Sequence, residues 1–150
     1  MRVLFASDHA GLELKRRLFE AARAGGVEAV DLGPLTAEAV DYPVFAHLLS
    51  REILAGRADR GVLICGTGIG MSMAANRHAG IRAALCHDAY TAEMARRHND
   101  ANVLCMGGRV IGAGVAAQIV EVFLGTGFEG GRHQRRAGLI EPPPDRQEEQ

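Results

Sequence analysis

Short apolar runs alternate along the chain with longer segments in which apolar residues recur every three or four positions. The apolar runs predict strands at residues 2–7, 27–32, 61–65, 81–86 and 102–106. The amphipathic segments that follow them predict helices at about residues 12–24, 44–54, 71–78, 89–98 and 113–124. The run at 61–65 is apolar throughout, which indicates a strand buried on both faces of a sheet.

The regular alternation of strand and helix predicts the architecture. Parallel strands need a long crossover, usually a helix, so the alternation indicates a parallel sheet. We therefore expect one α/β domain over residues 1–140, with a five-stranded parallel sheet and helices on both faces. Residues 129–140 hold several basic side chains and form a predicted C-terminal arm, and the polar, Pro-rich residues 141–150 predict a disordered tail.

Composition narrows the class of protein. The chain has 150 residues, 47% hydrophobic and 23% charged, with a formal net charge of -1, which is typical of one soluble globular domain. The near-zero charge and the lack of Trp argue against binding to nucleic acid or to an anionic membrane surface. Neither an export signal nor a membrane-spanning run is visible, so we expect a cytoplasmic protein whose three cysteines are reduced.

Glycine is the unusual residue, at 19 positions, and its densest cluster is Cys-Gly-Thr-Gly-Ile-Gly at residues 65–70. Glycines at alternate positions between a strand and a helix let backbone N–H groups point inward and hold an anion. The cluster lacks the Gly-Lys-Ser/Thr of a Walker A loop and does not match the dinucleotide pattern, which disfavours a dinucleotide site. The alternative interpretation is a tightly packed turn without a ligand.

Reactive side chains stand at the predicted strand ends, where ligands of parallel sheets bind. Cys65 opens the Gly-rich loop, and is either a base or nucleophile favoured by nearby N–H groups or a buried inert thiol. Asp8 and His9 follow the first strand, and either cap the first helix or move protons. A zinc site built with Cys86 and Cys105 is disfavoured, because the cysteines stand about twenty residues apart without a C-x-x-C pair.

A second group of candidates lies late in the chain. His98 and Asn99 end the fourth helix, at the opposite end of its crossover, so His98 could reach the pocket only across a subunit interface. Arg132 and Arg136 stand at i and i+4, and on a helix they could clamp a dianion such as phosphate. Together with the first group, these residues fit proton transfer on a small phosphorylated molecule.

The chain also resembles a known family, ribose-5-phosphate isomerase type B. The resemblance runs in order from residue 2 to about residue 140, and the motifs that carry it are residues 7–11 (Ser-Asp-His-Ala-Gly), 41–43 (Asp-Tyr-Pro), 65–70, 80–84 (Gly-Ile-Arg-Ala-Ala), 98–104 (His-Asn-Asp-Ala-Asn-Val-Leu) and 130–136 (Gly-Gly-Arg-His-Gln-Arg-Arg). It implies a Rossmann-like α/β/α sandwich and a homodimer, sometimes paired into a tetramer, with active sites at the dimer interface. It implies no metal and no organic cofactor.

The resemblance also implies a role for each candidate. Cys65 would be the base that moves a proton between C1 and C2 of the sugar, and His98, with help from Asp8, would open the sugar ring. The enediolate would be stabilised by Thr67 and the loop amides, namely those of Gly66, Thr67, Gly68, Ile69 and Gly70. The remaining substrate contacts would come from Asn99 on hydroxyls, from Tyr42 lining the pocket, and from His9, Arg109, Arg132 and Arg136 on the phosphate.

Several functions remain open within and outside this family. One branch of it uses a Glu after the Gly-rich loop instead of the cysteine, and the presence of Cys65 and Met71 here indicates the thiol branch. Related isomerases act on galactose 6-phosphate, allose 6-phosphate or tetrulose phosphates, so substrate length is less certain than reaction type. A non-catalytic phosphate- or nucleotide-binding domain and a thiol redox sensor are the alternatives from other classes.

Overall fold

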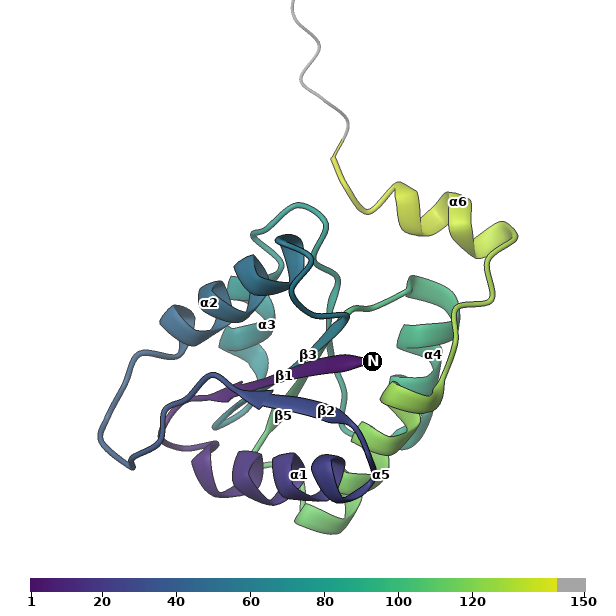
Figure 1. The fold of residues 1–150 in the computed structure, drawn as a ribbon. Helices are drawn as coiled ribbons and strands as arrows, with labels where there is room; N and C mark the ends of the chain where they lie inside the picture. Colours follow the sequence, from purple (N-terminus) through teal and green to yellow (C-terminus); the bar gives the residue numbers. More distant parts are fainter. Residues whose placement is uncertain (143–150) are drawn as a thin grey trace, which may run out of the picture.

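The computed structural model describes residues 1–142 (Figure 1). It contains β1 (Arg2–Ser7), α1 (Leu12–Ala24), β2 (Glu28–Asp31), α2 (Tyr42–Leu54), β3 (Arg60–Cys65), α3 (Ile69–Ala75), β4 (Ala83–Leu85), α4 (Ala89–Asn99), β5 (Val103–Gly107), α5 (Ala113–Gly125) and α6 (Arg132–Gly138). Of the tail expected at 141–150, residues 143–150 lie outside the described part. Glu141 accepts a hydrogen bond from the Gly80 N–H at 2.7 Å.

The five strands form one parallel sheet in the order β2-β1-β3-β5-β4, which confirms the predicted sheet. β4 is shorter than predicted, because the backbone on its N-terminal side is bonded elsewhere. The Ile81 N–H donates to the His78 carbonyl at 3.0 Å, and the Arg82 N–H donates to the Asn102 side chain at 2.8 Å. α2 begins at Tyr42, two residues earlier than predicted, with Pro43 in the first turn, where its missing N–H costs no hydrogen bond.

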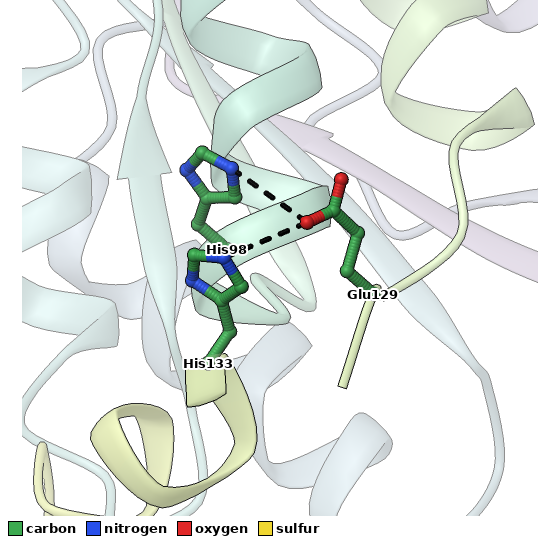
Figure 2. A group of neighbouring side chains, drawn as sticks. All are labelled: His98, Glu129 and His133. Carbon is green, nitrogen blue, oxygen red and sulfur yellow. Dashed lines mark ion pairs between the residues drawn. The ribbon is translucent and has the colours of Figure 1, made fainter. Parts of the chain in front are cut away.

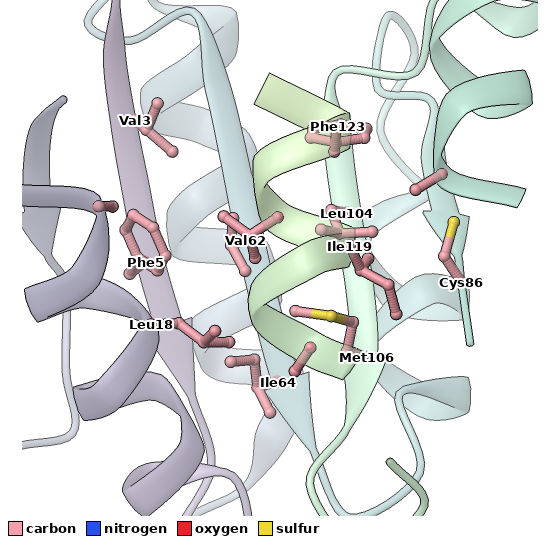
Figure 3. Packing of buried hydrophobic residues seen from close by; sticks show 14 of the residues in the cluster. Val3, Phe5, Leu18, Val62, Ile64, Cys86, Leu104, Met106, Ile119 and Phe123 are labelled. Carbon is pink, nitrogen blue, oxygen red and sulfur yellow. The ribbon is translucent and has the colours of Figure 1, made fainter. Parts of the chain in front are cut away.

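Helices cover both faces of the sheet, so the predicted α/β/α sandwich is also confirmed (Figure 1). α2 and α3 lie on one face, and α1, α4 and α5 lie on the other. Side chains alternate across each strand, so Val62 and Ile64 of β3 join the core under α1 and α5, seen in Figure 3, while Leu63 and Cys65 join the core under α2 and α3. The Cys65 side chain therefore belongs to the α2/α3 side of the sheet.

The strand order determines where a ligand can bind. From β1 the chain continues to β2 on one side, and after α2 it enters β3 on the other side of β1. Ligands of open α/β sheets bind at such a reversal, outside the carboxyl ends of the strands. Here that position lies between the ends of β1 and β3, which carry Asp8 and Cys65.

Candidate active site

The loop after β3 encloses the Cys65 thiol. Cys65 is the last residue of β3 and is 4% exposed. Its Sγ accepts a hydrogen bond from the Gly68 N–H at 3.0 Å, and the Thr67 Oγ1 accepts one from the Ile69 N–H at 3.3 Å. The Cys65 carbonyl accepts the Gly108 N–H at 2.8 Å, which ties this loop to the end of β5. Sulfur and backbone N–H groups are thus brought together in one small turn.

Only glycine fits at position 68 of this loop. Gly68 has φ of 79°, in the left-handed region that side chains disfavour. A Cβ there would lie 2.6 Å from Leu85 Cδ1 and 2.8 Å from the Met106 carbonyl carbon. The Gly68 N–H that contacts the sulfur is therefore held in place by close packing against β4 and β5.

The loop after β1 lies against the same site. The Asp8 carboxylate, which is buried, accepts the Gly11 N–H at 3.0 Å, and the His9 Nδ1 accepts the Val40 N–H at 3.3 Å. The N-cap residue of α1 is Gly11, which has no side chain to accept an N–H of the first helical turn. The Asp8 carboxylate therefore closes the turn before the helix and does not cap the helix itself. A Cβ on Gly108 would lie 3.1 Å from the Ala10 carbonyl oxygen, so the loops after β1 and β5 touch.

Arg109 and Tyr42 flank the Gly-rich loop. The Arg109 N–H donates to the Gly66 carbonyl at 3.0 Å, and its guanidinium lies beside Gly66, 3.5 Å from where a Cβ would stand. The Tyr42 ring lies against Gly70, where a Cβ would be 2.6 Å from Cζ. The structure therefore brings together one group of predicted site residues, the Cys65 group: Asp8, His9, Tyr42, Cys65, Gly66, Thr67, Gly68, Ile69, Gly70 and Arg109.

The remaining predicted residues form a second group around the end of α4. The His98 and His133 rings are stacked, with centroids 4.2 Å apart and an interplanar angle of 3° (Figure 2). The Glu129 Oε2 lies 4.0 Å from the His98 Nε2 and 3.5 Å from the His133 Nε2. Arg132 and Arg136 lie on α6, which packs against α4. We call His98, Asn99, Glu129, Arg132, His133 and Arg136 the His98 group.

Two buried or half-buried arginines hold the end of α4 in place. Asp100, with φ of 48°, ends the helix, and its carboxylate accepts the Arg82 Nη2 and the Arg96 Nη1, both at 2.9 Å. The Arg82 Nε also donates to the Asn99 carbonyl at 3.1 Å. His98 and Asn99 therefore sit on a rigid helix end and not on a loose loop.

The two groups lie at opposite ends of the strands, with the Cys65 group at the edge formed by the carboxyl ends and the His98 group at the edge formed by the amino ends. α4 runs back across the sheet from the carboxyl end of β4, and just after it the Asn102 carbonyl accepts the N–H of Gly61, near the start of β3. Cys65 stands four residues further along β3, about 13 Å away at 3.3 Å per residue. His98 thus lies at the edge expected from the sequence, and one chain does not bring it to Cys65.

Burial and neighbouring charges shift the pKa values of several side chains. Burial, together with positive charge on His98 and Arg132, holds the pKa of His133 below its usual value. A hydrogen bond from Arg97 lowers the pKa of Glu129. Burial raises the pKa of Cys86 to about 11 and also raises that of Cys105, so both thiols are protonated and inert at neutral pH.

Comparison with known proteins relates this geometry to a family. The family model described as Ribose/Galactose Isomerase matches residues 3–140. The chain is 45% identical over 139 residues to the protein named ribose-5-phosphate isomerase B of Escherichia coli, with 93% of each chain covered. The chain belongs to the ribose/galactose isomerase family. It is accordingly an aldose–ketose isomerase.

Solved structures agree with this assignment. The isomerase superimposes on ribose-5-phosphate isomerase B of Clostridium thermocellum with a TM-score of 0.92, at 46% identity, covering 93% of this chain and 95% of that one. The corresponding protein of Thermotoga maritima gives a TM-score of 0.91 at 50% identity, covering 93% and 96%. The predicted family and fold are therefore both confirmed.

Two residues beside His98 and one buried charge in α1 were not predicted from the sequence. Glu129 and His133 were noted only as members of the C-terminal arm, although their i,i+4 spacing places them on one face of a helical turn. Lys15 stands among charged residues in the first helix, where a solvent-exposed side chain is the usual expectation. It is fully buried instead, and its Nζ donates to the Asp31 carboxylate at 2.6 Å and to the Pro34 carbonyl at 2.7 Å. Its spacing of three residues from Leu18 was the available signal.

Across residues 1–142 of the isomerase, no helix is both long and apolar enough to cross a membrane. The cytoplasmic location stays a prediction.

Proposed function

We propose that this isomerase interconverts ribose 5-phosphate and ribulose 5-phosphate through an enediolate, with Cys65 as the base. The observation that carries the proposal is the Cys65 Sγ at the carboxyl end of β3, in contact with the Gly68 N–H. The printed names of the Escherichia coli relative and of both solved structures support the choice of pentose phosphate.

The chemistry needs only one proton to move along the sugar. The Cys65 thiolate would take the proton from C2 of the open-chain aldose and return it at C1, while a proton passes from the C2 hydroxyl to the carbonyl oxygen at C1. Negative charge on the enediolate oxygens would be met by Thr67 and the loop N–H groups.

The residues for ring opening and part of the phosphate site would come from a second copy of the chain. His98 would transfer the ring-opening proton with help from Asp8 of the other subunit, and Asn99 would hold hydroxyls. The separation of the two groups within one chain supports this arrangement, because neither edge of the sheet holds the full set. The phosphate would be held by His9 and Arg109 of one subunit and by Arg132 and Arg136 of the other.

An exposed apolar surface beside the Cys65 loop supports the same homodimer. It belongs to α2 and α3 and consists of Tyr42, Val44, Leu48, Ile69 and Met73, each more than a third exposed. Apolar side chains gathered on one face are typical of a subunit interface. A second copy seated there, with its α4 and α6 turned toward the loop, would complete the site.

The direct test is conversion of ribose 5-phosphate by the purified protein without added metal or cofactor. Wild type is expected to turn over. Cys65→Ala is expected to lose about 10²–10⁴-fold in kcat while keeping its circular dichroism spectrum, because a general base contributes a factor of that size and nothing replaces it. Activity retained by Cys65→Ala would remove the base from the proposal. His98→Asn is expected to slow the cyclic sugar more than an open-chain substrate.

Mixing two variants that are each impaired on cyclic ribose 5-phosphate tests the shared site. If each site takes Cys65 from one subunit and His98 from the other, hybrids of Cys65→Ala and His98→Asn contain one intact site and one doubly altered site. Random exchange of subunits in a two-fold dimer would then restore about a quarter of wild-type activity. A mixture that gains no activity after demonstrated exchange would contradict the shared site.

A hexose phosphate is the second candidate substrate, because the matching family model is described as covering both ribose and galactose isomerases. Galactose 6-phosphate and allose 6-phosphate should therefore be assayed beside ribose 5-phosphate. A higher kcat/KM on a hexose phosphate would keep the mechanism and change the substrate. Binding of phosphate compounds without any turnover would favour a non-catalytic binding domain.

A further inference from the structure

We propose that His98, Glu129 and His133 form a binding site for a divalent transition metal such as Zn²⁺. Two imidazoles and one carboxylate converge here, with the ligand atoms all within 4.8 Å of one another (Figure 2). Imidazole and carboxylate are ligands that bind Zn²⁺, and three protein ligands with an open fourth position form a common zinc geometry.

The spacing of the ligand atoms is close to what zinc requires. With metal–ligand bonds of about 2.0–2.1 Å in a tetrahedron, neighbouring ligand atoms lie about 3.4 Å apart. The Glu129 Oε2 is 3.5 Å from the His133 Nε2 and 4.0 Å from the His98 Nε2. All three ligand atoms lie within 4.8 Å of one another. Because the two rings are parallel, with an interplanar angle of 3°, binding one ion requires the imidazoles to rotate so that their ring planes converge on it.

The segment that carries Glu129 and His133 is held by backbone hydrogen bonds. The Glu129 N–H donates to the Arg97 carbonyl at 3.1 Å, which fastens the segment before α6 to the end of α4. The His133 N–H donates to the Gly130 carbonyl at 3.0 Å, which begins the turn of α6. These bonds place the backbone of Glu129 and His133 beside the end of α4, which carries His98.

Arg97 orients the carboxylate for this role. Its Nε donates to the Glu129 Oε1 at 2.6 Å, and it also donates to the Glu93 Oε1 at 2.9 Å through Nη1. Oε1 is therefore occupied while Oε2 faces the two imidazoles, and ligating carboxylates in proteins are commonly fixed by a partner in this way. Arg132, whose Nε lies 3.4 Å from the His133 Nε2, has an exposed side chain that can turn away into solvent.

The donor set selects among metals. Two nitrogens and one oxygen suit Zn²⁺, Co²⁺ or Ni²⁺, whereas Mg²⁺ and Ca²⁺ prefer oxygen ligands alone. The His98 and Glu129 side chains are 38% and 36% exposed, so an ion can enter from solvent.

A metal bound here would occupy the His98 Nε2 lone pair. If His98 opens the sugar ring, as proposed above, Zn²⁺ would therefore act as a reversible inhibitor.

The test is isothermal titration of Zn²⁺ into untagged, metal-free isomerase, with Mg²⁺ as the control ion. Wild type is expected to bind a single Zn²⁺ per chain and no Mg²⁺. Glu129→Gln keeps the side-chain size, removes the anionic ligand and is expected to weaken Zn²⁺ binding at least about 10–100-fold. His133→Gln gives a second, independent ligand deletion if the first variant fails to fold.

Two control variants locate the ion. His47→Gln alters the separate His47–His78 pair, whose nitrogens are 2.8 Å apart, and should leave Zn²⁺ affinity unchanged. Cys65→Ala should also retain the ion. No Zn²⁺ binding by wild type, unchanged binding by both ligand variants, or loss of binding in Cys65→Ala would each overturn the site. Turnover of ribose 5-phosphate is measured separately. If Zn²⁺ binds at this site without inhibiting turnover, the metal site stands and the proposed role of His98 in ring opening is contradicted.

Discussion

Replacing Gly68 by alanine adds one methyl group at the tightest point of the Cys65 loop. Two costs follow from the structure. The φ of 79° costs a side chain roughly 1–2 kcal/mol, and forcing a Cβ to within 2.8 Å of the Met106 backbone adds about 1–3 kcal/mol of overpacking. Together they predict a loss of about 2–5 kcal/mol in the free energy of unfolding.

Gly26→Ala is the matched control. Gly26 has a similar φ of 83°, but a Cβ there would meet nothing within 4 Å, so this variant carries the backbone cost alone. Urea denaturation followed by circular dichroism should give Gly68→Ala a clearly lower midpoint than Gly26→Ala at the same m-value. In thermal unfolding, at about 2–4 °C per kcal/mol for a chain of this size, Tm of Gly68→Ala should fall by about 10 °C.

The same pair of variants tests the site. Relief of the clash would move the Gly68 N–H away from the Cys65 Sγ, so ribose 5-phosphate turnover should fall sharply in Gly68→Ala and persist in Gly26→Ala. Equal urea midpoints for the two variants would refute the steric reasoning. Full turnover by Gly68→Ala would show that this N–H is not needed by the thiol.

Two further predictions concern buried charge and pH. Lys15→Met leaves Asp31 without its buried ion-pair partner and should cost about 3 kcal/mol in the free energy of unfolding by urea titration, whereas a loss below about 1 kcal/mol would show that the pair is dispensable. Burial, with positive charge from His47 and Arg51, lowers the pKa of His78, so the unfolded chain binds this proton first as pH falls below about 6.5 and the folded state loses stability. His78→Gln should therefore lose less stability than wild type between pH 7.5 and pH 5.5, and a larger loss would reverse the assigned sign.

Most of the Cys65 group was predictable because its residues lie at or just after the end of a strand; Tyr42, which begins α2, entered only through the family resemblance. In a parallel sheet all carboxyl ends meet at one edge, so residues such as Asp8, Cys65 and Arg109 are brought together without knowledge of the strand order. The role of Asp8 in the turn before α1 was less predictable. A carboxylate just before a helix is expected to accept an N–H of the first helical turn, but Asp8 accepts the N–H of Gly11, the residue before the helix. That choice depends on the close packing of Gly11 against β3, where a Cβ on Gly11 would lie 2.3 Å from the Ile64 carbonyl oxygen.

The His98 group shows what local patterns leave open. The sequence indicated that His98 ends a helix at the far edge of the sheet, and that a turn of helix could pair Arg132 with Arg136. It contained no sign that α6 folds back onto α4, stacking His133 on His98 and aiming Glu129 at both rings. That contact joins segments about thirty residues apart, and it depends on the direction the chain takes after α5.

The amino-acid sequence by itself determined the order of strands and helices, the parallel sheet, the Gly-rich loop around Cys65 and, through its motifs, the family. These features follow from hydrophobic period and turn chemistry, which depend on residues that are neighbours in the chain. Only the tertiary structure decided that Lys15 is buried against Asp31, that β4 is short, and that His98 meets Glu129 and His133. Such contacts depend on which distant segments pack together, because burial and charge pairing act through space and not along the chain.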